Sequence, residues 1–342
     1  MKKIRGFACL ISILAICLLA ASCEEKADPS YEHMVGVTSF ELASFLPVSQ
    51  LVDLEASGVA YPDNFTVKWR IPEIYEDTLT GTHLTIRTPE EPGYLTVTVI
   101  TNSYGYYELT SSRTAMLIDT ASSLTGRVFK GGRFTDPRDG QQYRTTYAGN
   151  LEWFAENLKW AGAGTCYEGC DVLQPLLGRL YTWNEATGGE KGDGLAGGPQ
   201  GACPEGWSIP TAEDWEDLGK VLNGNKPVNF LANWDSLGQK LTVEAYLNGS
   251  KIWPISPDNL KKNSVYWNAL PAGYNMRADD IYRDITSYGM WWSSAKRNEE
   301  RAYYRYIYFD ADYCGVNYAN VDDVAFSVRC VREWPGPPVY DE

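Results

Sequence analysis

Residues 203–215, CPEGWSIPTAEDW, constrain the fold more strongly than any other stretch of the chain. Pro210 ends an extended segment and Thr211 is a favourable N-cap, with Asp214 three residues later as an acidic variant of the capping box. Gly224 ends the predicted helix. The apolar face of that helix consists of Trp215, Leu218 and Leu222.

Acidic side chains crowd the first turns of this helix, namely Glu213, Asp214, Glu216 and Asp217. Negative charge at this end stabilises a helix through its dipole. Two adjacent acids in a first turn face in different directions, which does not suit a pair that shares one reaction. We therefore interpret the cluster as helix-capping charge rather than as a catalytic pair, and Trp207 and Trp215 as core residues.

The N-terminus has the pattern of an export signal over residues 1–22. Three basic residues precede the apolar run FACLISILAICLLA, which is too short to span a membrane comfortably, and small residues then lead to Cys23. This order resembles a bacterial lipobox, in which the cysteine is lipidated, although Ala20 stands where leucine is usual. A plain secretory signal followed by a chance cysteine is the alternative.

Residues 23–33 form an acidic tether similar to that of surface-exposed lipoproteins of the Bacteroidetes. Removal of residues 1–22 takes away three positive charges and no acidic ones, so the formal net charge of −14 becomes −17. Such a charge repels nucleic acid and anionic lipid, so we expect no nucleic-acid partner and membrane attachment only through acyl chains such as palmitate on Cys23. The expected location is the outer membrane, at the cell surface or on the periplasmic face.

Eight cysteines occur, of which five lie beyond the signal and Cys23. An oxidising compartment favours disulfides, and the odd number leaves one thiol over. Zinc is the rival interpretation, but C-x3-C has no second paired motif, and neither His33 nor His83 lies near it in the sequence. We expect disulfides, and neither a metal nor a cofactor.

Residues 34–119 show alternating short runs at 66–71, 83–88 and 94–101, separated by turn residues. This spacing predicts a small antiparallel β-sandwich. The order of Trp69, the later β-rich run and paired tyrosines is similar to Ig-like spacer domains of bacterial surface proteins. Residues 120–126 are polar and are interpreted as a linker.

From residue 127 the chain becomes rich in Gly, Trp, Tyr and Asn, and apolar spacing predicts a helix over 149–158. Seven ordered blocks lie in this part of the chain. They are FTDPRDGQQYRTTYAGNLEWFAENLKW (134–160), CYEGC (166–170), GRLYTWNEA (178–186), CPEGWSIPTAEDWEDL (203–218), LPAGY (270–274), WWSSA (291–295) and SVRCV (327–331).

These blocks resemble the Fibrobacter succinogenes major paralogous domain, over residues 127–333, followed by a tail at 334–342. The domain is also similar, more remotely, to the C-type-lectin-like fold that includes formylglycine-generating domains. The resemblance implies an α+β C-type-lectin-like domain after an all-β Ig-like sandwich. In that frame Cys203 pairs with Cys330 and Cys166 with Cys170. Cys314 is then either a buried free thiol or bonded to Cys166 or Cys170.

Catalysis is not expected. No histidine lies beyond residue 83, so a Ser-His-Asp or Cys-His arrangement cannot form within the C-terminal domain. The carboxylate pairs Asp279-Asp280 and Asp322-Asp323 could serve a glycosidase, but neighbouring acids in loops are typical of solvated turns. We therefore expect a protein that is not an enzyme.

Binding is the favoured role, because aromatic side chains give large rigid contacts with glycans and proteins alike. Alternation in YYRYIYFD (303–310) predicts a strand with one buried and one accessible face. Asn320 and Asp322, with Asp323, are also a faint calcium candidate. The predicted ligand-binding residues are Tyr266, Trp267, Trp291, Trp292, Tyr304, Tyr306, Asn320 and Asp322. We expect adhesion or glycan capture, with a structural role in a surface assembly such as a pilus as the alternative.

Overall fold

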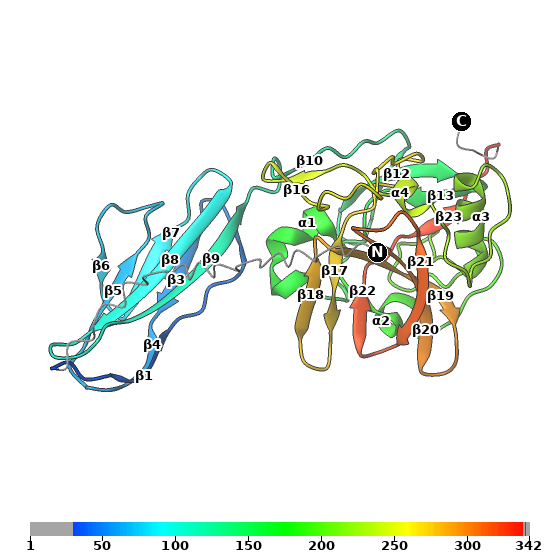
Figure 1. Ribbon diagram of the computed structural model, residues 1–342. Helices are drawn as coiled ribbons and strands as arrows, with labels where there is room; N and C mark the ends of the chain where they lie inside the picture. The colour runs from blue at the N-terminus through cyan, green and yellow to red at the C-terminus, as the bar shows by residue number, and fades with distance from the viewer. Residues whose placement is uncertain (1–29, 338, 340–342) are drawn as a thin grey trace, which may run out of the picture.

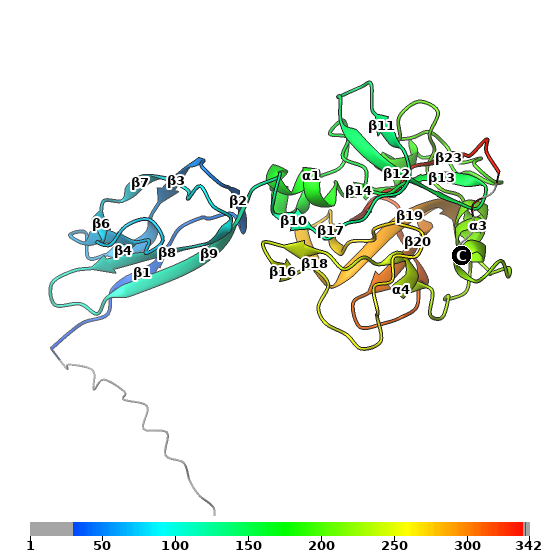
Figure 2. The same cartoon turned by 90° about the horizontal axis from the view of Figure 1, so that it is seen from above.

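The computed structural model describes residues 30–337 and residue 339, and strands far outnumber helices in it. Figures 1 and 2 show two bodies joined by a short connection. The predicted signal, the lipid site Cys23, most of the tether and part of the tail lie outside the described residues. Among the residues that are described, no helix is both long and apolar enough to cross a bilayer.

The N-terminal domain is built only of strands. They are β1 (Val35–Ser39), β2 (Phe45–Pro47), β3 (Leu51–Glu55), β4 (Ser57–Tyr61), β5 (Thr66–Arg70), β6 (Leu79–Thr80), β7 (His83–Arg87), β8 (Gly93–Asn102) and β9 (Leu109–Ile118). The predicted strands at 66–71, 83–88 and 94–101 are thus confirmed as β5, β7 and β8, and β8 alternates between buried and half-buried residues along its length.

Two layers of this domain enclose one core. One is a sheet in the order β2-β9-β8-β5-β6, and the β3-β7 pair lies over it. Trp69 on β5 is fully buried against Phe40, and its indole nitrogen donates to the Gly81 carbonyl at 2.8 Å. Leu54 of β3 and Ile86 of β7 complete the core from the other layer. The sandwich therefore rests on apolar packing.

The C-terminal domain combines short strands with a few short helices. Its strands are β10 (Leu124–Thr125), β11 (Arg133–Thr135), β12 (Gln142–Ala148), β13 (Leu151–Phe154), β14 (Tyr181–Thr182), β15 (Tyr246–Leu247), β16 (Ser250–Lys251), β17 (Ala272–Met276), β18 (Ile281–Ile285), β19 (Tyr288–Lys296), β20 (Arg301–Tyr308), β21 (Gly315–Asn320), β22 (Val324–Phe326) and β23 (Val331–Glu333). Its helices are η1 (Tyr167–Gly169), η2 (Asp171–Leu173), α1 (Gln174–Leu177), α2 (Trp183–Thr187), α3 (Ala212–Leu222) and α4 (Gly238–Leu241).

These strands form several small sheets rather than one large one. The orders are β11-β12-β13-β23, β14-β22-β17-β18, β19-β20-β21 and β10-β15-β16. The helix predicted over 149–158 is wrong, because the structure has strand β13 there. All four residues of β13 are buried: β12 and β23 pair with its edges, while Trp215 packs against Trp153 on one face and Trp207 against Phe154 on the other. A strand buried on both faces shows no alternation, so its apolar residues imitated helical spacing.

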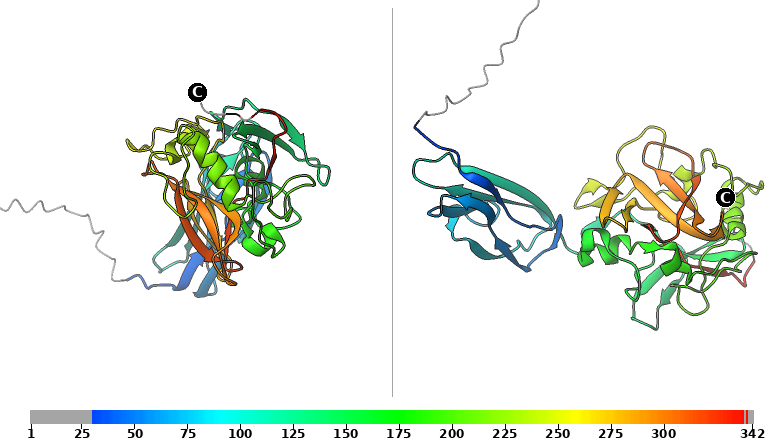
Figure 3. Two further views of the ribbon diagram at one scale, coloured as in Figure 1. Left: turned by 90° about the vertical axis from the view of Figure 1, so that its right-hand side faces the viewer. Right: turned by 90° about the horizontal axis from the view of Figure 1, so that it is seen from below.

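Helix α3 confirms the prediction made from residues 203–215. The Thr211 hydroxyl accepts a hydrogen bond from the Asp214 amide at 3.1 Å, and the Asp214 carboxylate accepts one from the Thr211 amide at 2.9 Å. Trp215, Leu218 and Leu222 are fully buried. Figure 3 shows α3 packed across the strands of the C-terminal domain, where it contacts β19.

Arg329 is buried in the C-terminal core and forms no ion pair with any residue that the structure describes. Its guanidinium donates to the carbonyls of Phe154, Trp267 and Asn268 at 2.6–3.0 Å and to Asn157 Oδ1 at 2.7 Å. It also lies 4.1 Å from the centroid of the Trp267 ring. Burial lowers the pKa of Arg329 to about 9. Backbone carbonyls therefore replace water around this charge, and the hydrogen bonds of Arg329 join three separate segments of the chain.

The two domains are joined by contacts as well as by the chain. Strand β10 lies inside the segment interpreted as a linker, and it pairs with β15 of the C-terminal domain. Asn248 donates from its side chain to the Leu117 carbonyl at 2.7 Å. Phe45 of β2 packs edge-on against Tyr167 of η1, with ring centroids 6.3 Å apart. The N-terminal domain thus rests on the segment that carries Cys166 and Cys170.

Candidate functional site

The cysteines separate into one disulfide and three thiols. Cys203 and Cys330 are bonded, as expected, and both are fully buried. The predicted bond between Cys166 and Cys170 is wrong, because both are free thiols. Cys166 Sγ lies 3.1 Å from the Arg179 guanidinium and 3.3 Å from the Asp171 carboxylate, whereas Cys170 Sγ is directed at the Glu168 carbonyl. Each thiol has its own polar partners. Cys314 is a buried free thiol.

Three of the predicted ligand-binding residues are core residues. Trp267, Trp291 and Trp292 are each at most 1% exposed, so none can contact a ligand directly. The Trp291 indole donates to Asn157 Oδ1 at 2.9 Å, and the Trp292 indole donates to the Tyr181 carbonyl at 2.7 Å. The prediction fails for these residues because a loop rich in aromatic residues gives the same sequence signal whether its rings face solvent or the core.

Asn320 and Asp322 shape a turn. Asn320 Oδ1 accepts from the amides of Asp322 and Asp323 at 2.9 and 3.3 Å, and the Asp322 carboxylate accepts from Asn184 at 2.6 Å. These bonds use the oxygens that a calcium ion would need. Within residues 30–337 and 339, no group of three or more His, Cys, Asp or Glu side chains is arranged to hold a metal.

Tyr304 and Tyr306 lie on one face of β20, as predicted from its alternation. Register places Tyr304 opposite Trp292, Tyr306 opposite Met290, and Tyr308 opposite Tyr288 on the neighbouring strand. The opposite face of β20 carries half-buried Tyr303 and buried Arg305 and Ile307. We call the half-buried residues on the outward side the tyrosine face: Tyr274, Tyr288, Tyr304, Tyr306 and Tyr308.

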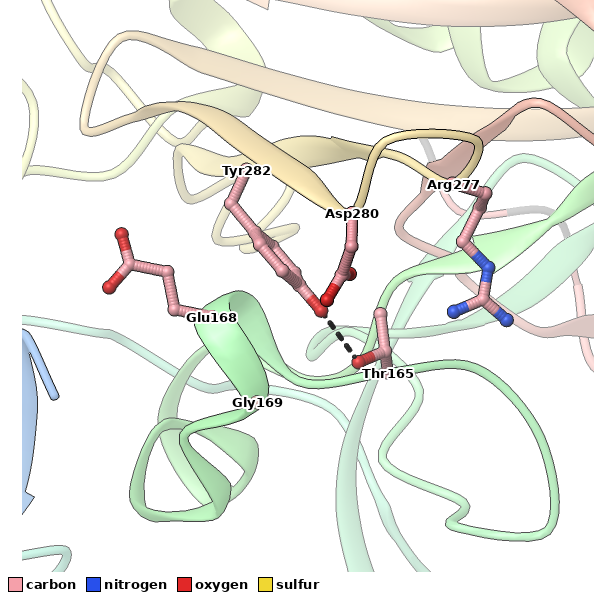
Figure 4. A pocket seen from close by; sticks show the side chains of 6 residues that line it. All are labelled: Thr165, Glu168, Gly169, Arg277, Asp280 and Tyr282. Atoms are coloured by element: carbon pink, nitrogen blue, oxygen red, sulfur yellow. Dashed lines mark hydrogen bonds between the residues drawn. The ribbon is translucent and has the colours of Figure 1, made fainter. Parts of the chain in front are cut away.

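An open cleft of about 670 Å³ lies between η1 and the β17–β18 hairpin (Figure 4). Its residues come from two distant parts of the chain. They are Thr165, Glu168, Gly169, Arg277, Asp280 and Tyr282. Tyr282 belongs to the opposite side of the hairpin from Tyr274, because it pairs with Asn275 in the register. The cleft and the tyrosine face are therefore separate surfaces.

A chain of polar groups runs along one side of the cleft. The hydroxyls of Thr165 and Tyr282 are 2.9 Å apart, and Figure 4 shows the Asp280 carboxylate beside the Tyr282 hydroxyl. Burial raises the pKa of Tyr282, the Thr165 hydrogen bond lowers it, and the Asp280 carboxylate raises it. These directions match a Tyr282 hydroxyl that donates to Asp280 while Thr165 donates to Tyr282.

Asp280 is also held by a second residue, because the side-chain amide of buried Asn275 donates to its Oδ1 at 3.3 Å. Asn275 Oδ1 is itself buried without a hydrogen-bond partner. Arg277 at the hairpin tip forms an ion pair with Glu185 of α2, whose carboxylate also caps that helix. The cleft therefore presents a fixed carboxylate, a fixed guanidinium, two hydroxyls and an aromatic ring.

Sequence reasoning did not select these cleft residues. Asp280 was considered only as half of an acidic pair, and Tyr282 was not considered. Residues 277–282, RADDIY, mix charged and apolar residues without a regular alternation, as an ordinary surface hairpin does, so they gave no signal of a site.

The comparisons with known proteins bear on the domain as a whole. The family model described as the Fibrobacter succinogenes major domain matches residues 146–332, more than half of the chain. The chain belongs to this family. No match was found among curated proteins or among solved structures.

Several sequence blocks typical of the Fibrobacter succinogenes major domain form its core. Asn157, Trp291, Arg329 and the Cys203–Cys330 disulfide all lie in these blocks and are buried. Only one wall of the cleft, Glu168 and Gly169, comes from such a block. Membership of the family therefore accounts for the core but assigns no ligand to the cleft.

Proposed function

We propose that this protein is an exported, lipid-anchored binding protein whose C-terminal domain captures a glycan unit in the cleft. The observation that carries the proposal is the fixed arrangement of the Asp280 carboxylate, the Tyr282 and Thr165 hydroxyls, and the Arg277 guanidinium around one open cleft.

The chemistry of these groups suits sugar hydroxyls. A hydroxyl donates one hydrogen bond and accepts others, so it is best matched by a carboxylate acceptor and a guanidinium donor in the same site. Ligand sites of about 300–1,000 Å³ are common, and the cleft is within that range. The Tyr282 ring adds an apolar surface for the face of a sugar ring. The polar groups are held by other side chains before a ligand arrives, which reduces the entropy lost on binding.

The glycan proposal is tested with the mature full-length chain on a glycan array, followed by titration of any ligand found. Asp280→Asn and Tyr282→Phe are expected to weaken binding about tenfold each. The first removes a charged acceptor, and the second removes a hydroxyl that is hydrogen-bonded within the chain of polar groups. Asp279→Asn is the matched control, because Asp279 is the exposed neighbour of Asp280 and does not line the cleft. Equal affinity of Asp280→Asn and Asp279→Asn would refute the role of the cleft.

The domain architecture within this proposal is an Ig-like spacer that carries a C-type-lectin-like domain. The two-layer sandwich with its buried Trp69 supports the first part. The long loops, small sheets and the disulfide between the segment before α3 and the C-terminal strand support the second. An experimental structure that superposes on neither fold would contradict this assignment.

The lipid anchor at Cys23 is supported by the sequence around it. Metabolic labelling with an alkyne analogue of palmitate is expected to label the protein, and Cys23→Ala is expected to abolish the label and release the chain from the membrane fraction. Protease treatment of intact cells separates the cell surface from the periplasmic face. Labelling of the Cys23→Ala variant would contradict the anchor.

A structural role, as an accessory subunit of a surface assembly such as a pilus, is the second candidate. The tyrosine face favours it, because half-buried tyrosines that form a continuous surface are typical of protein interfaces. Tyr288→Ser with Tyr308→Ser is expected to abolish co-purification with neighbouring gene products while leaving glycan binding intact. A strictly monomeric wild-type protein in native extracts would count against this role. We do not propose an enzyme, since both histidines of the described residues lie in the N-terminal domain.

A further inference from the structure

A group of positive side chains stands out on a chain whose formal net charge is −14. Two guanidinium groups contact the Phe129 ring, that of Arg127 5.4 Å and that of Arg144 5.0 Å from its centroid. The next residue, Lys130, places its ammonium 4.4 Å from the centroid of the Tyr266 ring. We call these residues, together with Arg133, the cationic patch: Arg127, Phe129, Lys130, Arg133, Arg144 and Tyr266.

Most of this positive charge is not neutralised within the chain. Arg127 forms an ion pair with Glu156 at 2.9 Å. In the part of the chain that the structure describes, no ion pair involves Lys130, Arg133 or Arg144. Arg144 Nε is moreover buried without a hydrogen-bond partner. The patch is therefore a local excess of at least three positive charges.

Two of these charges face each other at a cost in stability. Arg133 of β11 and Arg144 of β12 are direct partners in the antiparallel register, which places their side chains on the same face of the hairpin. Like charges in directly opposite positions destabilise a sheet. An anion bound between the two strands would remove this repulsion, so the register itself favours an anionic ligand.

The loop that carries the patch is held firmly. The Val128 amide donates to Asn268 Oδ1 at 3.0 Å, and Asn268 Nδ2 donates back to the Val128 carbonyl at 2.8 Å. A Cβ at Gly131 would lie 2.0 Å from the Thr145 carbonyl oxygen, so only glycine allows the loop to approach β12 this closely. Figure 2 shows β11 and β12 on a different side of the domain from β17 and β18, which form one wall of the cleft.

We propose that the cationic patch binds an acidic polysaccharide, whose carboxylates or sulfates are spaced one sugar or more apart. Arg127, Lys130, Arg133 and Arg144 supply the charge, and the Phe129 and Tyr266 rings hold three of those cations in place. Nucleic acid and an anionic bilayer present dense negative charge that the net charge of the chain opposes. The carboxylates of an acidic polysaccharide are separate from one another. Each can bind the cationic patch at a distance shorter than the electrostatic screening length of about 8 Å. This site and its ligand are independent of the cleft and of the proposed function.

Affinity electrophoresis of the mature full-length chain in native gels containing polygalacturonate tests the proposal. The polymer is expected to retard the wild type, whereas neutral dextran is not. Arg133→Gln with Arg144→Gln is expected to weaken binding about tenfold, since each lost exposed ion pair changes affinity about two- to fivefold. Lys130→Gln, at an exposed position, is expected to weaken it about threefold with no effect on folding.

The matched control is Lys68→Gln with Arg70→Gln, which removes the same charge from β5 of the N-terminal domain and is expected to change binding less than twofold. Tryptophan fluorescence confirms that each variant is folded. Absence of retardation by polygalacturonate, or equal losses in the patch and control variants, would overturn the proposal. Equally tight binding of the wild type to vesicles of anionic phospholipid, lost in the same patch variants, would also overturn it by assigning the patch to a membrane.

Discussion

The Cys203–Cys330 disulfide gives the sharpest stability prediction. The two cysteines are 127 residues apart, so the bond closes a long loop in the unfolded chain. Loop-closure entropy for that length corresponds to about 5 kcal/mol at 25 °C. The Ser208 and Val331 amides donate to each other's carbonyls at 2.8 and 3.0 Å, and they still join the same two segments when the disulfide is absent. The folded state therefore changes little, and the loss arises mainly in the unfolded state.

The test replaces both cysteines, Cys203→Ala with Cys330→Ala, so that no unpaired thiol remains at the site. Both side chains are fully buried, so the missing sulfurs add about 1 kcal/mol each for the void. The expected loss in the free energy of unfolding is thus about 5–7 kcal/mol, an upper figure because the unfolded chain keeps some structure. A loss of that size is comparable with the whole stability of many domains, about 5–15 kcal/mol.

Urea unfolding followed by tryptophan fluorescence measures this loss. Trp69 is the single tryptophan of the N-terminal domain, ten of the twelve lie within residues 127–333 and Trp334 follows them, so the signal reports mainly the domain that holds the disulfide. Cys314→Ala is the matched control, because Cys314 is a buried free thiol; its replacement measures the void together with the lost contact to Arg305, but no loop closure. If the double variant loses no more stability than Cys314→Ala, the entropic reasoning is refuted.

Three further changes test the core and the thiols. Arg329→Met is expected to cost about 3–5 kcal/mol in urea unfolding, because three buried carbonyls lose the Arg329 donor and Asn157 Oδ1 keeps only its bond from Trp291; a loss below about 1 kcal/mol would contradict this. Burial raises the pKa of Asp214 to about 6 from 3.8, so its contribution to stability is present below about pH 4 and lost as the pH rises to 6. As the pH rises between these values, the free energy of unfolding of the wild type is therefore expected to fall by up to about 3 kcal/mol relative to that of Asp214→Asn. A relative rise would contradict this prediction. Burial raises the pKa of Cys166 to about 12, so alkylation of the folded chain by iodoacetamide at pH 8 is expected to be far slower than alkylation in urea, as mass spectrometry can show.

Local features could be predicted because their physics is local. The capping box at Thr211 and Asp214, the helix that follows and the alternating strands of the N-terminal domain depend on neighbours a few residues away. Strand β13 could not be predicted in this way. Its two faces are covered by Trp215 and Trp207, more than 50 residues away, and its edge partner β23 lies about 180 residues further along the chain.

The candidate sites show the same division. Tyr304 and Tyr306 were found because a strand alternates, but Trp291 and Trp292 were assigned to the wrong environment because their burial depends on Asn157 and Tyr181. The sequence did not indicate that Cys166 and Cys170 would each find polar partners of their own.

The sequence by itself determined the helix after Thr211, the three strands β5, β7 and β8 of the sandwich and, through the resemblance of its ordered blocks, the family and the disulfide. Only the tertiary structure decided that Thr165 and Asp280 share one cleft and that Arg133 faces Arg144 across a hairpin. The physical reason is that capping and alternation depend on residues a few positions apart. A binding surface, in contrast, depends on which distant segments pack together and on which side chains that packing leaves exposed.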